Sequence, residues 1–222
     1  MFEEKISNLK NEIVEFSNLI LDMFSSAIKY IFSKDEPGVV KIIQEQEKKA
    51  NDYEVEVEEK CVHIIAQYQP RAFDLRFILC ILKMNNDFER IADHVVNIAQ
   101  SGLYLLKNNV RLLMEYNTDI QQIFNLTNNM LTESIKSFIQ QDSQKAQQLC
   151  QKDQDVDNLK TQIYKKIIED IKSEPVNIEN YFHLERIINN IERIADLTTN
   201  ICEDIIFLYE AKIIKHHKEE YL

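Results

Sequence analysis

The sequence predicts an all-α protein made of two tandem three-helix bundles, in which six long antiparallel helices follow a pseudo-two-fold repeat. The 222 residues include only two glycines and three prolines, whereas these two residues make up about 12 % of an average protein. Hairpins and sheet corners use both residues, so an all-β fold is close to excluded, as are glycine-rich phosphate loops. Apolar residues recur at three- and four-residue spacing, which is typical of amphipathic helices. A five-residue motif also occurs twice in the chain.

Few breaks interrupt the helical pattern, and each break separates two expected helices. Pro37 opens the second segment and Pro70 separates the second from the third, because proline begins helices better than it continues them. The asparagine pair at 108–109 breaks the pattern near the middle of the chain. Asp142 and Asn177 are expected caps of the last two helices. The six expected helices span residues 4–33, 37–68, 71–107, 111–140, 143–172 and 178–214.

The halves of the chain repeat one another. Glu89-Arg90-Ile91-Ala92-Asp93 returns 103 residues later as Glu192-Arg193-Ile194-Ala195-Asp196. Upstream, the pair Glu47 and Asn51 matches Asp153 and Asp157 at an offset of 106 residues. A matched block of this length is hard to obtain by chance. We therefore expect one repeat over residues 1–108 and a second over 109–222, the latter ending in a short charged tail.

Acidic and amide side chains share one stripe on the third and the sixth expected helix. At about 100° per residue, each set falls within an arc about 80° wide. The two sets are Asn86, Glu89, Asp93 and Asn97, and Asn189, Glu192, Asp196 and Asn200. The preceding helix of each repeat carries one of the i, i+4 pairs described above. If that pair faces the stripe, three or four carboxylates come together, and a bound multivalent cation relieves their mutual repulsion. Oxygen ligands favour Mg²⁺, Mn²⁺, Ca²⁺ or iron, and the flanking asparagines are candidate supporting residues.

These carboxylates also have other interpretations. A single i, i+4 pair is more often a solvated face, and the bundle could be a docking scaffold without metal. A two-metal hydrolase would need a general base outside the ligands, and the sequence offers no candidate. Redox di-iron chemistry has no support, because no histidine follows a glutamate by three residues. Arg90 and Arg193 point away from the neighbouring glutamates on the helix, so we expect them to pair with other carboxylates.

The amino-acid composition limits the class of protein and indicates its cellular compartment. The net charge of −11 argues against nucleic-acid binding, which needs a basic face. The four cysteines lie in apolar helical contexts without any CxxC pair, so we expect buried thiols in a reducing compartment. The sequence has no apolar N-terminal leader, and its longest apolar runs are too short to span a membrane. These features predict a cytoplasmic protein. Because no Ser-His-Asp, Cys-His or nucleophile-elbow arrangement can be read from the sequence, we also expect a protein that is not an enzyme.

The two E-R-I-A-D copies, the carboxylate pairs and the block Gln69-Pro70-x-Ala72-x-Asp74-Leu75-Arg76 resemble the PhoU family. The resemblance covers about residues 4–213 and implies two tandem three-helix bundles that hold iron, zinc, manganese or magnesium ions. It also implies a cytoplasmic, often homodimeric negative regulator of phosphate uptake and of the phosphate-starvation response. Its partners would be the phosphate ABC transporter and a sensor histidine kinase, with membrane association through them alone. An accessory subunit of a low-affinity phosphate permease is the alternative.

The resemblance also implies specific site residues. The first metal site would use Glu47, Asn51, Glu89 and Asp93, and the second would use Asp153, Asp157, Glu192 and Asp196. Because Asn51 stands where an aspartate would be a stronger ligand, we expect the first site to be the weaker one. Asp74 and Arg76 occur only in the first half and would be an intramolecular anchor or a partner contact. Alanine replaces the usual motif glycine at positions 92 and 195.

Overall fold

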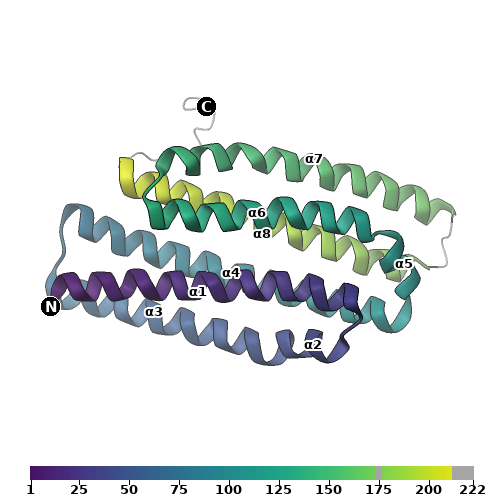
Figure 1. The fold of residues 1–222 in the computed structure, drawn as a ribbon, viewed down its shortest axis with the longest axis horizontal. Coiled ribbons are helices and arrows are strands. Elements are labelled where there is room, and N and C mark those ends of the chain that lie inside the picture. The colour runs from purple at the N-terminus through teal and green to yellow at the C-terminus, as the bar shows by residue number, and fades with distance from the viewer. Residues whose placement is uncertain (174–176, 212–222) are drawn as a thin grey trace.

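The computed structural model describes residues 1–173 and 177–211, and within these ranges it contains helices and no strand. The first half consists of α1 (Phe2–Ser33), α2 (Glu36–Lys41), the π-helical segment η1 (Ile42–Gln46), α3 (Glu47–Tyr68) and α4 (Ala72–Asn108). The second half consists of α5 (Val110–Glu115), α6 (Asn117–Gln140), α7 (Ser143–Ser173) and α8 (Ile178–Glu210). The predicted architecture of two tandem three-helix bundles is confirmed (Figure 1).

Two of the expected helices are not continuous. The segment expected at 37–68 contains the π-helical turn η1, which interrupts the α-helical hydrogen-bond pattern just before Glu47. The segment expected at 111–140 breaks at Tyr116, whose buried ring hydrogen-bonds through its hydroxyl to Asp170 at 2.6 Å. That bond links the junction of α5 and α6 to α7 at the end of the second bundle. The last three residues of the sixth expected helix, and the charged tail, lie outside the described residues.

The scarcity of glycine has a structural counterpart at the helix ends. Helices α1, α3, α6 and α8 all end on a left-handed residue, and none of these residues is glycine. They are Lys34, Gln69, Gln141 and Ala211, with φ between 48° and 61°. Gly102 has a different role, because a Cβ there would lie 2.3 Å from the Cδ1 of Ile31. Glycine thus allows α4 to approach α1 closely.

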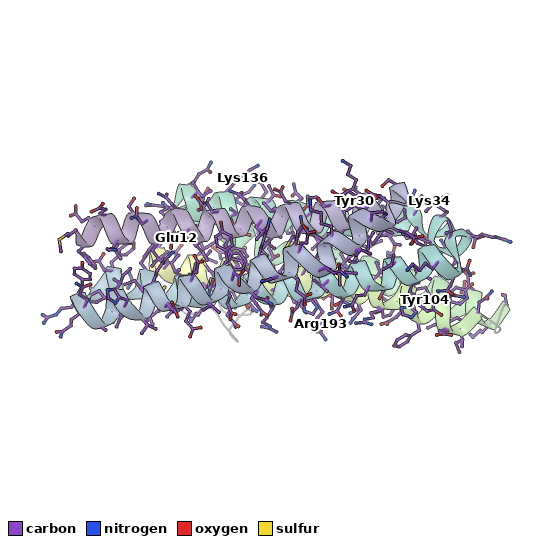
Figure 2. The ribbon with its side chains drawn as sticks, turned by 90° about the horizontal axis from the view of Figure 1, so that it is seen from below. Glu12, Tyr30, Lys34, Tyr104, Lys136 and Arg193 are labelled. Carbon is purple, nitrogen blue, oxygen red and sulfur yellow. The ribbon has the colours of Figure 1, made fainter. Side chains whose placement is uncertain are left out.

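The two bundles meet along α4 and α8, which lie side by side in the middle of the molecule (Figure 1). Helices α1 and α6 extend this contact, and the rings of Phe24 and Phe124 meet between them with centroids 4.8 Å apart. The core formed by these helices is continuous and dominated by isoleucine, leucine and phenylalanine. Viewed from below, the molecule is a long rod with the first bundle toward the viewer (Figure 2). In the described parts of the chain, no helix is apolar over a sufficient length to cross a bilayer.

Candidate functional site

In the first repeat, the predicted stripe of α4 faces the side of α3. Glu89 is half-buried and Asp93, one turn further along the helix, is exposed. The side-chain amide of Asn85 donates a hydrogen bond of 2.8 Å to the backbone carbonyl of Glu54. Asn85 is almost completely buried, so this bond marks the alignment of the two antiparallel helices. The alignment places Glu54 close to Glu89.

The surroundings of Glu89 disfavour its charged form. Burial is the largest cause of a raised pKa for this carboxyl group, and the negative charges of Asp93 and Glu54 raise that pKa further. Arg90 opposes the shift only weakly, and its guanidinium pairs instead with Asp87 at 3.4 Å. Three carboxylates are therefore gathered with little positive charge to balance them.

The register of α3 against α4 places the other two predicted ligands of the first repeat. Counting back along α3 from the Asn85–Glu54 contact, Asn51 comes level with Glu89 and Glu47 comes level with Asp93. Glu47 is half-buried and Asn51 is exposed. Glu47 is also the first residue after the π-helical turn, and such turns are frequent at functional sites.

Sequence reasoning missed two residues of this cluster. Asn85 lies one helical turn before Glu89 and could have been found by extending the stripe. Glu54 lies one turn after Asn51, but the acidic run of α3 around it conceals which of its glutamates faces α4. Only helix packing identifies Glu54 as the residue at the seam.

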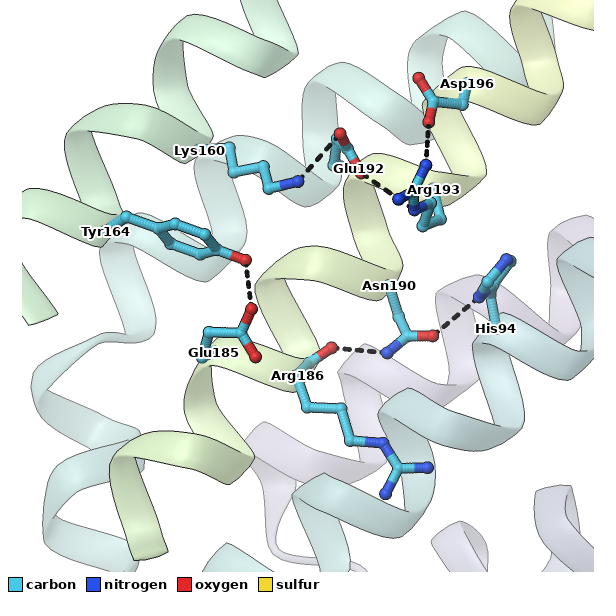
Figure 3. A network of polar contacts seen from close by, with 9 residues as sticks. All are labelled: His94, Lys160, Tyr164, Glu185, Arg186, Asn190, Glu192, Arg193 and Asp196. Atoms are coloured by element: carbon cyan, nitrogen blue, oxygen red, sulfur yellow. Dashed lines mark hydrogen bonds and ion pairs between the residues drawn. The ribbon is translucent and has the colours of Figure 1, made fainter. Parts of the chain in front are cut away.

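The stripe of the second repeat is arranged differently (Figure 3). The Nζ of Lys160 on α7 lies 2.9 Å from Oε1 of Glu192 on α8. The Nε of Arg193 lies 3.8 Å from the other oxygen of Glu192, and its Nη1 lies 3.1 Å from Asp196. Arg193 thus pairs with another carboxylate, Asp196, as expected, and its side chain also comes near the neighbouring Glu192. Positive groups of the chain itself contact both acids of this motif.

Asp153 and Asp157 lie on the same helix as Lys160, and both are half-buried. The buried thiols of Cys150 and Cys202 are neighbours across the α7–α8 seam. These cysteines lie ten residues from Lys160 and ten from Glu192 respectively, as antiparallel neighbours should. The same register places Asp157 level with the turn between Glu192 and Asp196, and Asp153 one turn further along α8.

The four asparagines that flank the repeated motif have different surroundings. Asn86 is exposed, and Asn189 and Asn200 are half-buried. Asn97 accepts a hydrogen bond from the guanidinium of Arg186 in the second repeat, so its contact is with the other bundle. Sequence reasoning also missed Asn190, whose side-chain oxygen lies 2.7 Å from Nδ1 of His94 across the same α4–α8 seam.

The block from Gln69 to Arg76 spans the beginning of α4, which lies near the end of α8. Asp74 is half-buried in the first turn of α4. The Nε of Arg76 donates a 2.9 Å hydrogen bond to the backbone carbonyl of Leu208, near the end of α8. Its guanidinium also lies over the ring of Phe73, 5.7 Å from the centroid. Arg76 thus connects the beginning of α4 to the last turns of α8.

The two stripes differ in how well they suit a metal ion. Among residues 1–173 and 177–211, no three side chains of His, Cys, Asp or Glu converge closely enough to share one ion. The first repeat nevertheless has the donor chemistry of a hard cation site: Glu54, Glu89 and Asp93 lie close together, and the buried Oδ1 of Asn85 accepts no hydrogen bond. In the second repeat, a lysine nitrogen already contacts the central glutamate.

Comparison with known proteins places the fold and the repeat in a family. The PhoU domain model matches the chain twice, over residues 13–102 and 120–205. A protein of Aquifex aeolicus named phosphate-specific transport system accessory protein PhoU homolog is 31 % identical, with 97 % of this chain and 96 % of the relative covered. PhoU homolog 1 of Thermotoga maritima, also named as an accessory protein of that system, is 28 % identical, with 96 % of this chain and 91 % of the relative covered.

Solved structures agree with this assignment. The crystal structure of the phosphate transport system regulatory protein PhoU from Streptococcus pneumoniae matches with a TM-score of 0.87 at 28 % identity, covering 96 % of this chain and 99 % of that one. PhoU from Pseudomonas aeruginosa has the same fold, with a TM-score of 0.89 at 23 % identity. Its coverage is 96 % of this chain and 100 % of the other. With the doubled motif, the matched domain pair and the shared fold, this chain belongs to the PhoU family.

Proposed function

We propose that this protein is a non-catalytic accessory protein of a phosphate transport system that negatively regulates phosphate uptake and phosphate-starvation signalling. The observation that carries the proposal is similarity over nearly the whole chain to accessory and regulatory PhoU proteins. The partners proposed are the phosphate ABC transporter and its associated sensor histidine kinase, with the chain acting in the cytoplasm as a homodimer. Membrane association would then occur only through these partners.

Genetic replacement tests the regulatory role. The gene would be deleted in its own organism and then restored on a plasmid, with the empty plasmid as control. In phosphate-rich medium, deletion is expected to raise both phosphate uptake and expression of a phosphate-starvation reporter, and restoration to lower both. A starvation reporter that stays low in the deletion strain would contradict negative regulation. Copurification of the transporter or the kinase with the tagged chain would separate this role from that of a permease subunit.

We further propose that the first-repeat carboxylates bind a divalent cation such as Mn²⁺ or Mg²⁺, or an iron or zinc ion. Glu47, Glu89 and Asp93 would hold it, with Asn51, Glu54 or Asn85 adding oxygen ligands. The support is the raised pKa of Glu89, caused by burial and by two neighbouring acids, together with the hydrogen-bond acceptor of Asn85 that is left without a donor. A bound cation would add its charge where the chain supplies little, and it would stabilise the α3–α4 seam.

Metal titration tests this part of the proposal. Chelator-treated protein would be titrated with Mn²⁺, and binding would be followed by calorimetry and by the melting temperature. The double variant Glu89→Gln with Asp93→Asn is expected to weaken Mn²⁺ binding by at least tenfold and to abolish the rise in melting temperature. The matched control, Glu58→Gln with Asp52→Asn, changes exposed acids on α3 and should bind like the wild type. Equal binding by both double variants would leave the bundle as a scaffold without metal.

A further inference from the structure

The two repeats differ at one position of the seam that carries the motif. The offset of 106 residues that relates Glu47 to Asp153 also relates Glu54 to Lys160, and the offset of 103 residues relates Glu89 to Glu192. Glu54 with Glu89 in the first repeat therefore corresponds to Lys160 with Glu192 in the second. The first pair joins two like charges, and the second pair joins opposite charges.

The contact of Lys160 with Glu192 is close and shielded. The atoms Nζ and Oε1 are 2.9 Å apart, and the two side chains are 18 % and 11 % exposed. The lysine also lies 5.6 Å from the ring centroid of Tyr164, whose hydroxyl hydrogen-bonds to Glu185 (Figure 3). These contacts hold the ammonium group at the seam. A cation that approached Glu192 would meet a positive charge about 3 Å from the carboxylate, where screening is weak.

We propose that Lys160 is a tethered cation that takes the place of a metal ion in the second repeat, so that divalent cations bind at the first-repeat carboxylates and not at Glu192. This inference rests on the proposed metal binding of the first repeat. Because the ammonium group is attached to the chain, its effective concentration at Glu192 is far higher than that of any free ion. Glu192 of the second repeat then has a permanent positive partner, whereas Glu89 of the first depends on the available metal. This order reverses the expectation, based on Asn51, that the first site is the weaker one.

Exchanging the residues between the repeats tests the inference. Chelator-treated protein would be titrated with Mn²⁺ by calorimetry, with circular dichroism to verify the fold of each variant. Lys160→Glu gives the second repeat the residue of the first, and we expect it to bind about twice as much Mn²⁺ as wild type. Lys160→Gln, which removes the charge and keeps most of the length, should also gain binding. Glu54→Lys should weaken first-repeat binding at least tenfold. Lys165→Glu, an exposed position on the same helix, is the control and should bind like wild type.

The possible outcomes distinguish a failure of the role of Lys160 from a failure of metal binding in the first repeat. If wild type binds no Mn²⁺ but both Lys160 variants do, the first-repeat site fails and the role of Lys160 is supported. If the Lys160 variants fold and bind no more Mn²⁺ than wild type, the inference is overturned, whether or not the first repeat binds. Loss of wild-type binding through Glu192→Gln would also overturn it, because that carboxylate would then already be a ligand.

Discussion

His183 shows how a single side chain can make stability depend on pH. Its ring stacks on Tyr104 with centroids 3.7 Å apart, and its Nδ1 is buried without a hydrogen bond. Burial, and after it the charge of Arg186, lowers the pKa of this histidine below the ordinary 6.5. The unfolded chain therefore binds the proton more readily than the folded one. The stabilisation is complete above about pH 6.5 and is lost as pH falls toward the folded pKa.

We therefore expect His183→Gln to reduce the loss of stability on acidification. The free energy of unfolding in urea would be measured at pH 7.5 and pH 5.5 for wild type and variant. The variant should lose less stability between these values, because it lacks the group that takes up a proton on unfolding. His63→Gln, at an exposed position on α3, controls for the loss of a histidine as such. An identical change in wild type and His183→Gln would contradict the assignment.

At the scale of the helices, the left-handed ends are the clearest weakness of the fold. Gln141 ends α6 with φ of 61°, and the next residue, Asp142, donates its backbone N–H to the carbonyl of Ser137. A residue with a Cβ loses about 1 kcal/mol or more in this conformation, whereas glycine does not. We expect Gln141→Gly to stabilise the protein by about 1 kcal/mol in urea denaturation. The matched change Gln122→Gly, at an exposed site inside α6, should destabilise by about the same amount. Destabilisation by both changes would contradict the helix-end argument.

At the scale of the whole molecule, polar contacts along α4 and α8 join the two bundles. Lys83 on α4 lies 3.0 Å from the carboxylate of Asp204 on α8, which is only 4 % exposed. From α8, Arg186 reaches Asn97 on α4. The offset of 103 residues relates Lys83 to Arg186, so equivalent positions of α4 and α8 each supply a cation that reaches the other helix. Arg76 adds a third contact at the end of α8.

Loss of one contact between α4 and α8 should lower the stability of both bundles together. Lys83→Met keeps the apolar stem of the side chain but removes the positive charge beside a buried carboxylate. We expect it to lower the free energy of unfolding by about 2 kcal/mol, since taking a positive charge away from a buried carboxylate costs roughly this amount. In urea, fluorescence and circular dichroism should still report one shared transition. Adding Asp204→Asn to Lys83→Met should cost less than the sum of the single changes. A change below about 0.5 kcal/mol would show that the ion pair adds no stability.

Helix content, the tandem repeat and the acidic stripes could all be predicted from sequence because each depends on local spacing. Helical periodicity alone puts Glu89 and Asp93 on one face, and the second motif copy repeats that face. The breaks at η1 and Tyr116 were not predicted, because no proline or glycine marks them. They depend instead on how buried groups pack: Ile42 enters the core, and the hydroxyl of Tyr116 reaches Asp170.

The sequence by itself determined that this chain is helical, doubled and acidic along two seams, and its motifs were sufficient to indicate the family. Only the tertiary structure decided which side chains meet across those seams. Glu54 and Lys160 are one glutamate and one lysine among many on charged helices, and nothing local distinguishes them. The register of α3 on α4 places the first beside Glu89, and that of α7 on α8 places the second against Glu192. The physical reason is that helix periodicity is encoded residue by residue, whereas the charge at a buried seam depends on the packing of two helices.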